Sequence, residues 1–98
     1  MNDSVIRKYY RFYGHVQGVG FRWRAKYAAE SLGVTGFVRN RYDGSVEMEA
    51  EGTEEQLDQF LESISRARFI WIERVEEARI KPEGDRSFRY LDDLWEHK

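Results

Sequence analysis

The glycine-rich segment from Gly14 to Gly20 carries the residues best suited to chemistry in this sequence. It reads Gly-His-Val-Gln-Gly-Val-Gly and is followed at once by Phe21 and Arg22. Glycines allow the backbone to turn tightly and to approach a ligand without obstruction by Cβ atoms. If a helix begins after this segment, the free backbone amides and the positive end of the helix dipole form a site for a dianionic phosphate. Arg22 would then lie at the mouth of the site, where a guanidinium can bind two phosphate oxygens.

Spacing alone leaves two interpretations of this segment open, a phosphate site or a tight connection that needs flexible residues. It contains neither the G-x-G-x-x-G pattern of dinucleotide-binding loops nor the Gly-Lys-Ser/Thr of a P-loop. A second candidate is Asn40, whose carboxamide could orient a water molecule beside the phosphate. The alternative for Asn40 is a structural role in the turn that follows it.

Hydrophobic periodicity predicts the elements that must position these residues. Alternation predicts a strand over residues 8–16. A capping box formed by Thr53 and Gln56 predicts the start of the second of two helices. The first helix has apolar residues at i, i+3, i+4 and i+7, namely Ala25, Ala28, Ala29 and Leu32. Gly33 is expected to end this helix. Further strands are predicted over residues 34–41, 45–51, within 70–81 and at 88–91.

The turn at Gly44 sets the register of the second and third strands. A three-residue loop with Gly44 in the left-handed conformation places Val38 opposite Met48 and Asn40 opposite Val46. A two-residue loop would instead put a charged residue on the face of Met48. The hydrophobic match therefore favours the longer loop.

The order of the predicted elements is βαββαβ with a small additional strand. This order is typical of a ferredoxin-like α+β sandwich, in which two helices cover one face of an antiparallel sheet. Irregular alternation between residues 70 and 81 predicts a bulge or an uncertain register in the fourth strand. Glu47, Glu49 and Glu51 alternate with apolar residues, which predicts that the other face of the sheet is exposed to solvent. With no linker in sight, we expect a single domain over residues 1–98 with a core at about 7–91.

Composition excludes several functional classes. The chain has 98 residues, a net charge of −2, no cysteine and only two histidines. Disulfides, thiolate metal sites and cysteine nucleophiles are therefore excluded, and a multi-histidine metal site is not expected. No apolar run reaches the roughly 20 residues that span a bilayer, and the first residues lack the apolar stretch of a secretory signal. We expect a cytoplasmic monomer without bulk attraction to nucleic acids or membranes.

Two segments resemble the signatures of a known family. The stretch from Gly14 to Arg22 is similar to the acylphosphatase signature G-x-V-Q-G-V-x-F-R. The stretch from Gly36 to Asn40, with Gly44, Val46 and Gly52 at the expected offsets, resembles the second signature of that family. Two motifs in the right order, in a chain of the right length, make the resemblance specific. It is detailed in the first half of the chain and looser in the second.

This resemblance implies a ferredoxin-like acylphosphatase that hydrolyses the carboxyl–phosphate bond of small acyl phosphates by in-line attack of a water molecule. It assigns phosphate binding to Arg22 and positioning of the water to Asn40. It assigns the phosphate cradle to the loop amides of His15, Val16, Gln17, Gly18, Val19 and Gly20. Neither a metal nor an organic cofactor is expected. A carboxylate leaves readily, so no strong general acid is needed, and the proton of the water can pass to a phosphate oxygen of the substrate.

Three other functions remain open at this point. An inactive relative would bind a phosphorylated ligand without turnover. An RNA-binding ferredoxin-like module would stack bases on aromatic residues, although the glutamates of the third strand would repel a phosphate chain. The carbamoyl-phosphate-handling domain of a larger hydrogenase-maturation protein is the third alternative, but this sequence lacks its cysteine-rich zinc segments. A small acyl phosphate is therefore the expected partner, and neither nucleic acid nor membrane is.

Overall fold

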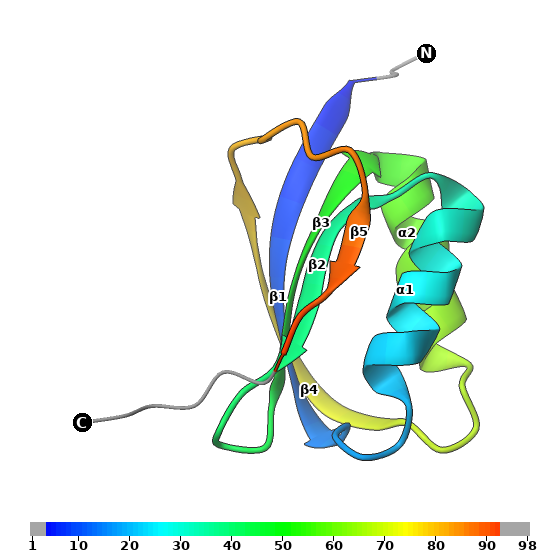
Figure 1. The fold of residues 1–98 in the computed structure, drawn as a ribbon, viewed down its shortest axis with the longest axis vertical. Coiled ribbons are helices and arrows are strands. Elements are labelled where there is room, and N and C mark those ends of the chain that lie inside the picture. The colour runs from blue at the N-terminus through cyan, green and yellow to red at the C-terminus, as the bar shows by residue number, and fades with distance from the viewer. Residues whose placement is uncertain (1–3, 93–98) are drawn as a thin grey trace.

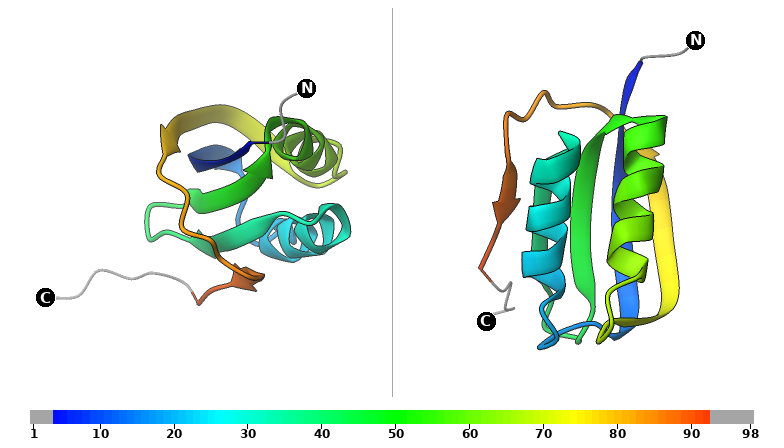
Figure 2. Two further views of the ribbon diagram at one scale, coloured as in Figure 1. Left: turned by 90° about the horizontal axis from the view of Figure 1, so that it is seen from above. Right: turned by 90° about the vertical axis from the view of Figure 1, so that its right-hand side faces the viewer.

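One five-stranded sheet with two helices on one face forms the part of the chain that the computed structural model describes, residues 4–92 (Figures 1 and 2). The strands follow the order β4-β1-β3-β2-β5 across the sheet. The elements are β1 (Val5–His15), α1 (Phe21–Leu32), β2 (Thr35–Asn40), β3 (Val46–Thr53), α2 (Glu54–Ser65), β4 (Trp71–Ile80) and β5 (Phe88–Tyr90). The predicted ferredoxin-like α+β sandwich is confirmed.

The sheet is mixed rather than purely antiparallel. The four longer strands pair antiparallel, as predicted. The short strand β5 is present close to its predicted position, but it pairs with β2 in parallel orientation. This difference matters for the site, because β5 runs alongside β2 toward the end of the sheet at which Asn40 lies.

The predicted register between β2 and β3 is confirmed. Val38 lies opposite Met48, and Asn40 lies opposite Val46. Gly44 has a φ of 92°, the left-handed conformation that the three-residue loop requires. Asn40 therefore lies at the end of β2 on the buried side of the sheet, and only 8% of its surface is exposed.

Local sequence signals correctly place the end of α1 and the start of α2. Gly33, with a φ of 79°, ends α1, and the capping box of Thr53 and Gln56 begins α2. The predicted bulge in β4 is found at Glu73, which the pairing with β1 skips. The core between helices and sheet includes large side chains from all layers: Tyr10, Phe12, Phe21, Val38, Met48, Leu57, Phe60 and Phe88.

The opposite face of the sheet is not the solvent-exposed surface that the alternation of glutamates predicted. Glu47 and Glu51 are each only 6% exposed. Arg39 and Arg41 both donate hydrogen bonds to the carboxylate of Glu47. The prediction was wrong because neighbouring strands supply arginines that pair with the glutamates, and a sequence pattern within one strand cannot show this.

Part of that face is also covered by the segment that joins β4 to β5, residues 81–87, here called the connector. It crosses one end of the sheet, as Figure 2 shows from above. Arg7, 1% exposed, donates to Glu51 at 2.9 Å and forms an ion pair with Asp85 of the connector at 3.1 Å. The carboxylate of Glu51 accepts hydrogen bonds from the backbone amides of Glu83 and Gly84. We call Arg7, Glu51 and Asp85 the clamp, because together they hold the connector against the sheet.

Candidate active site

The loop of residues 16–20 joins β1 to α1 at the end of the sheet opposite the connector (Figure 1). Val16 is 1% exposed and anchors the loop in the core. Gly18 and Gly20 have φ angles of 74° and 83°, and a Cβ added at either would meet no atom within 4 Å. Glycine is therefore required here by backbone conformation rather than by lack of space.

The backbone amides of this loop are not used by the fold. Within residues 4–92, none of the amides from Val16 to Gly20 donates a hydrogen bond to another protein group. The loop leads directly into α1, whose N-cap residue Gly20 provides no side-chain cap. Several backbone donors and the positive end of a helix dipole thus meet at one place, which favours binding of an oxyanion.

Gln17 ties this loop to the neighbouring hairpin through its side chain. Its Nε2 donates hydrogen bonds to the backbone carbonyl of Arg41 at 2.7 Å and to that of Ser45 at 2.8 Å. Both carbonyls belong to the β2–β3 hairpin that also carries Asn40. The side chain of Gln17 therefore holds the loop and Asn40 in a fixed relation, a role that the sequence did not indicate.

A small pocket of about 110 Å³ lies between the loop and Asn40. It is far smaller than the roughly 300 Å³ at which pockets begin to enclose whole drug-sized ligands, so it suits a single phosphate-sized group. Five predicted site residues and two others line it: Val16, Gly18, Gly20, Arg22 and Asn40, together with Phe21 and Tyr90. The structure thus brings most of the predicted residues together around one cavity.

Three predicted residues do not line this pocket, namely His15, Gln17 and Val19. His15 is exposed at the end of β1, where it lies opposite Trp71 of β4. Val19 is half-buried and packs against the core. Their side chains therefore support the loop or lie beside it rather than facing the cavity.

The guanidinium of Arg22 forms one wall of the pocket and is held in place by the C-terminal part of the chain. Its Cζ lies 4.4 Å from the centre of the Tyr90 ring, and its Nη1 donates to the carbonyl of Leu91 at 3.0 Å. Tyr90 was not predicted as a site residue. No local signal could have shown it, because only the parallel pairing of β5 brings this residue to Arg22.

Asn40 faces the cavity from the other wall. Its side chain is buried and makes no hydrogen bond to another group within residues 4–92. A buried carboxamide normally finds partners, so an open one beside an anion-binding loop is suited to bind a ligand or a water molecule. Asn40 can both donate to and accept from such a water.

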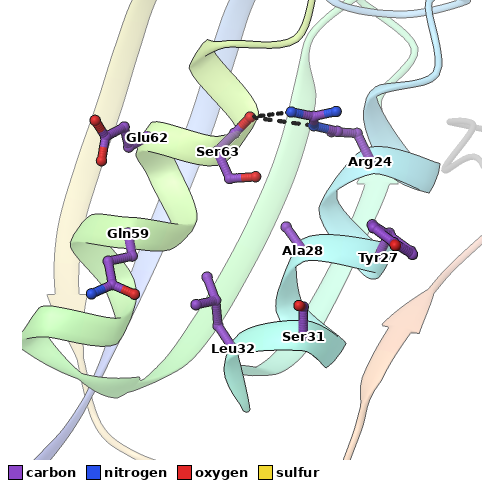
Figure 3. A pocket seen from close by; sticks show the side chains of 8 residues that line it. All are labelled: Arg24, Tyr27, Ala28, Ser31, Leu32, Gln59, Glu62 and Ser63. Carbon is purple, nitrogen blue, oxygen red and sulfur yellow. Dashed lines mark hydrogen bonds between the residues drawn. The ribbon is translucent and has the colours of Figure 1, made fainter.

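A larger hollow of about 390 Å³ lies elsewhere, between α1 and α2 (Figure 3). Arg24 spans it and donates through Nε and Nη2 to the backbone carbonyl of Ser63, at 3.2 and 3.0 Å. The remaining lining residues are Tyr27, Ala28, Ser31, Leu32, Gln59 and Glu62. This groove contains none of the predicted site residues, so the smaller pocket is the better candidate for catalysis.

The described residues contain neither a metal-binding cluster nor a membrane-spanning helix. Within residues 4–92, no group of three or more His, Asp or Glu side chains has an arrangement suited to a metal ion. No helix in the same part of the chain is long and apolar enough to cross a membrane.

Known proteins are similar to this chain over most of its length. The sequence profile of the acylphosphatase family matches residues 8–90. An acylphosphatase from Moorella thermoacetica is 40% identical over 89 residues, which cover 88% of this chain and 94% of the relative. An acylphosphatase from Lactiplantibacillus plantarum is 42% identical over 78 residues, covering 78% of this chain and 87% of the relative.

Solved structures give the same result for the fold. The acylphosphatase from Bacillus subtilis matches with a TM-score of 0.82 and 32% identity, covering 88% of this chain and 98% of that one. Full-length HypF, solved in a phosphate- and nucleotide-bound form, matches with a TM-score of 0.87 at 21% identity. That match covers 97% of this chain but only 13% of HypF, and at this identity it shows the shared fold alone.

Proposed function

This chain belongs to the acylphosphatase family, and we propose that the pocket between the loop 16–20 and Asn40 is its catalytic site. The protein is a hydrolase that cleaves the carboxyl–phosphate bond of small acyl phosphates, giving a carboxylate and inorganic phosphate. One observation supports the site above all others: a loop with open amides, an arginine and an open asparagine meet around one phosphate-sized cavity.

Phosphate binding is the task of the loop and of Arg22. The amides of residues 16–20 donate to the phosphoryl oxygens, with Gln17 and Val19 contributing through the backbone only. The guanidinium of Arg22 supplies a permanent positive charge on the same group. Because the pocket accommodates little more than the phosphoryl group, the acyl part of the substrate lies outside it. A contribution of His15 to binding stays a prediction.

Attack on phosphorus is the task of Asn40. Its carboxamide orients a water molecule in line with the bond to the leaving carboxylate. The water oxygen forms the new bond to phosphorus, the anhydride bond breaks with its electron pair on the carboxylate, and the proton of the water passes to a phosphoryl oxygen. Phosphoryl transfer depends mainly on such positioning and on stabilising charge on the equatorial oxygens, which fixed amides and Arg22 provide.

Hydrolysis of benzoyl phosphate in excess chelator tests this function, with a simple phosphomonoester as the negative comparison. We expect turnover of the acyl phosphate and none of the monoester. Arg22→Ala should abolish hydrolysis and weaken the binding of inorganic phosphate measured by calorimetry. Unchanged phosphate affinity in that variant would remove the pocket as the binding site. Activity that disappears with chelator would contradict a metal-independent reaction.

Three further properties stay predictions. We propose that the protein is a monomer, that it does not bind nucleic acid and that it is cytoplasmic. Pairing of Glu47 and Glu51 with arginines leaves little free positive charge on the sheet face that an RNA-binding module would use. Sedimentation, an RNA shift assay at varied salt and cell fractionation test these properties in turn.

A further inference from the structure

Tyr90 is a pocket residue whose part in the reaction is not explained by phosphate binding or by water attack. Tyr90 is 45% exposed and lines the cavity beside Asn40. One face of the ring carries the guanidinium of Arg22, with Cζ at 4.4 Å from the ring centre. The next residue, Leu91, accepts a hydrogen bond from Nη1 of the same guanidinium. Two adjacent residues therefore fix Arg22 in two different ways, by stacking and by hydrogen bonding.

The strand that carries Tyr90 is itself firmly placed. Tyr90 lies opposite Val38 in the parallel pair of β5 and β2, and the amide of Leu91 donates to the carbonyl of Val38 at 2.9 Å. Phe88, at the start of β5, is 1% exposed and packs edge-on against Phe60 of α2. Pairing with β2 and the packing of Phe88 in the core thus fix the backbone that carries the Tyr90 ring, although Tyr90 is partly exposed.

At the other end of the sheet, the clamp determines how the chain enters β5. Arg7 and Glu51 hold the connector by an ion pair to Asp85 and by hydrogen bonds from two connector amides. The connector then needs only a few residues to reach Phe88. Two features therefore set the position of Tyr90. The clamp fixes the chain before β5, and the pairing with Val38 fixes Tyr90 within the sheet.

We propose that Tyr90 is a positioning residue for hydrolysis, which holds the plane of the Arg22 guanidinium at the wall of the phosphate pocket. This inference rests on the proposed role of Arg22 in phosphate binding. An arginine side chain loses considerable rotamer freedom when it binds an anion. Stacking on a fixed ring restricts that freedom before the substrate arrives, so less of the binding energy is lost on ordering the side chain.

The test compares three substitutions with benzoyl phosphate as substrate and inorganic phosphate as inhibitor. Tyr90→Leu should raise KM and the inhibition constant of phosphate together by about fivefold, the factor equivalent to a cation–π contact of about 1 kcal/mol. The value of kcat should stay within about twofold, as expected when binding common to ground state and transition state is lost. Tyr90→Phe keeps the ring and should restore wild-type constants. Tyr90→Gln, a second variant without an aromatic face, should behave like Tyr90→Leu.

Tyr27→Leu is the matched control, because Tyr27 is 63% exposed, stacks on Trp23 and lies outside the pocket. It should leave both constants unchanged. In an Arg22→Ala background, Tyr90→Leu should change phosphate affinity by less than twofold, because its effect acts through Arg22. Wild-type constants in Tyr90→Leu, or a full effect that persists without Arg22, would overturn the inference while leaving the proposed function intact. Wild-type phosphate affinity in Arg22→Ala alone would instead overturn the proposed function.

Discussion

The two ends of the sheet differ in whether particular polar groups have hydrogen-bond partners. At the end with the loop 16–20, the loop amides and the carboxamide of Asn40 have no hydrogen-bond partner within the described residues. At the end with the connector, Arg7 contacts three carboxylates, and Glu51 accepts from Arg7 and from two backbone amides. Unpaired polar groups cost stability, so a fold keeps them where a ligand supplies the missing partners. The groups suited to bind a substrate therefore lie at the loop end, whereas the ion pairs of Arg7 stabilise the connector end.

The pKa values of Arg7 and Glu51 agree with this pairing at the connector end. Burial alone would lower the pKa of the Arg7 guanidinium, but its contacts with Glu51, Glu49 and Asp85 raise it above its ordinary value. Burial alone would raise the pKa of Glu51, but the hydrogen bonds from Glu83, Arg7 and Gly84 lower it. Both groups are therefore charged at neutral pH, and each stabilises the charge of the other.

Among the substitutions that compare the two ends of the sheet, Asn40→Ala should show the largest effect, and only on turnover. Loss of a group that positions the water should lower kcat by about 10³-fold, the upper range for removing one catalytic hydrogen-bonding group. The free energy of unfolding should hardly change, since the carboxamide makes no hydrogen bond in the fold. Steady-state kinetics with benzoyl phosphate measures kcat, and calorimetry with inorganic phosphate measures phosphate binding. Near-normal turnover would remove Asn40 from the mechanism.

Arg7→Met should show the converse pattern. Removing one partner of a buried ion pair leaves the carboxylates of Glu51 and Asp85 without their counter-charge, so the free energy of unfolding should fall by about 3 kcal/mol. Urea denaturation followed by far-UV circular dichroism measures this loss. Turnover at a temperature where the variant is folded should stay within about tenfold of wild type. A stable variant would show that the clamp is dispensable.

Acidification should produce a smaller loss of stability through the paired glutamates of β3. The pKa values of Glu51 and Glu47 are lowered in the folded protein by hydrogen bonds and arginines that outweigh burial. The unfolded chain, with glutamate pKa values of about 4.3, binds these protons first, so stability is present above that pH and falls as pH drops through the folded values. Denaturation midpoints measured from pH 7 to pH 3 should decline. They should decline less in Arg7→Met, and an equal decline would disconnect Arg7 from Glu51.

Two glycine substitutions compare the ends of the sheet at equal backbone cost. Gly18, in the loop, and Gly84, in the connector, have φ angles of 74° and 73°, and a Cβ at either would meet no atom within 4 Å. Each Gly→Ala change should lower the free energy of unfolding by about 1 kcal/mol, the cost of a left-handed conformation with a side chain. Only Gly18→Ala should also raise the phosphate inhibition constant, because it reorients a cradle amide. Equal kinetic effects from both would contradict the assignment.

His15→Gln should show the smallest effect. His15 is exposed and does not line the pocket, and the mechanism needs no histidine. The pH profile of kcat/KM should lack two steep limbs near neutrality, and the substitution should leave its shape unchanged. Limbs that are present in the wild type and vanish with His15 would identify a general acid or base that the mechanism omits.

The sequence predicted the features that depend on short stretches of chain. The loop glycines and Arg22 lie within one motif, Asn40 lies in the next, and Gly44 with the alternation of apolar residues set the register that buries Asn40. The capping box at Thr53 is equally local. These features could be read because backbone conformation and the periodicity of strands and helices are encoded by neighbouring residues.

Tertiary structure alone decided which distant segments meet at each end of the sheet. Tyr90 and Leu91 reach Arg22 only because β5 pairs in parallel with β2. Glu51 is buried because Arg7 and the connector come from other parts of the chain, and Glu47 because Arg39 and Arg41 pair with it. Such pairings depend on strand order and on the path of a connection, which the free energy of the whole fold selects. The sequence therefore determined the chemical groups of the pocket, and the fold determined which residues hold them in place.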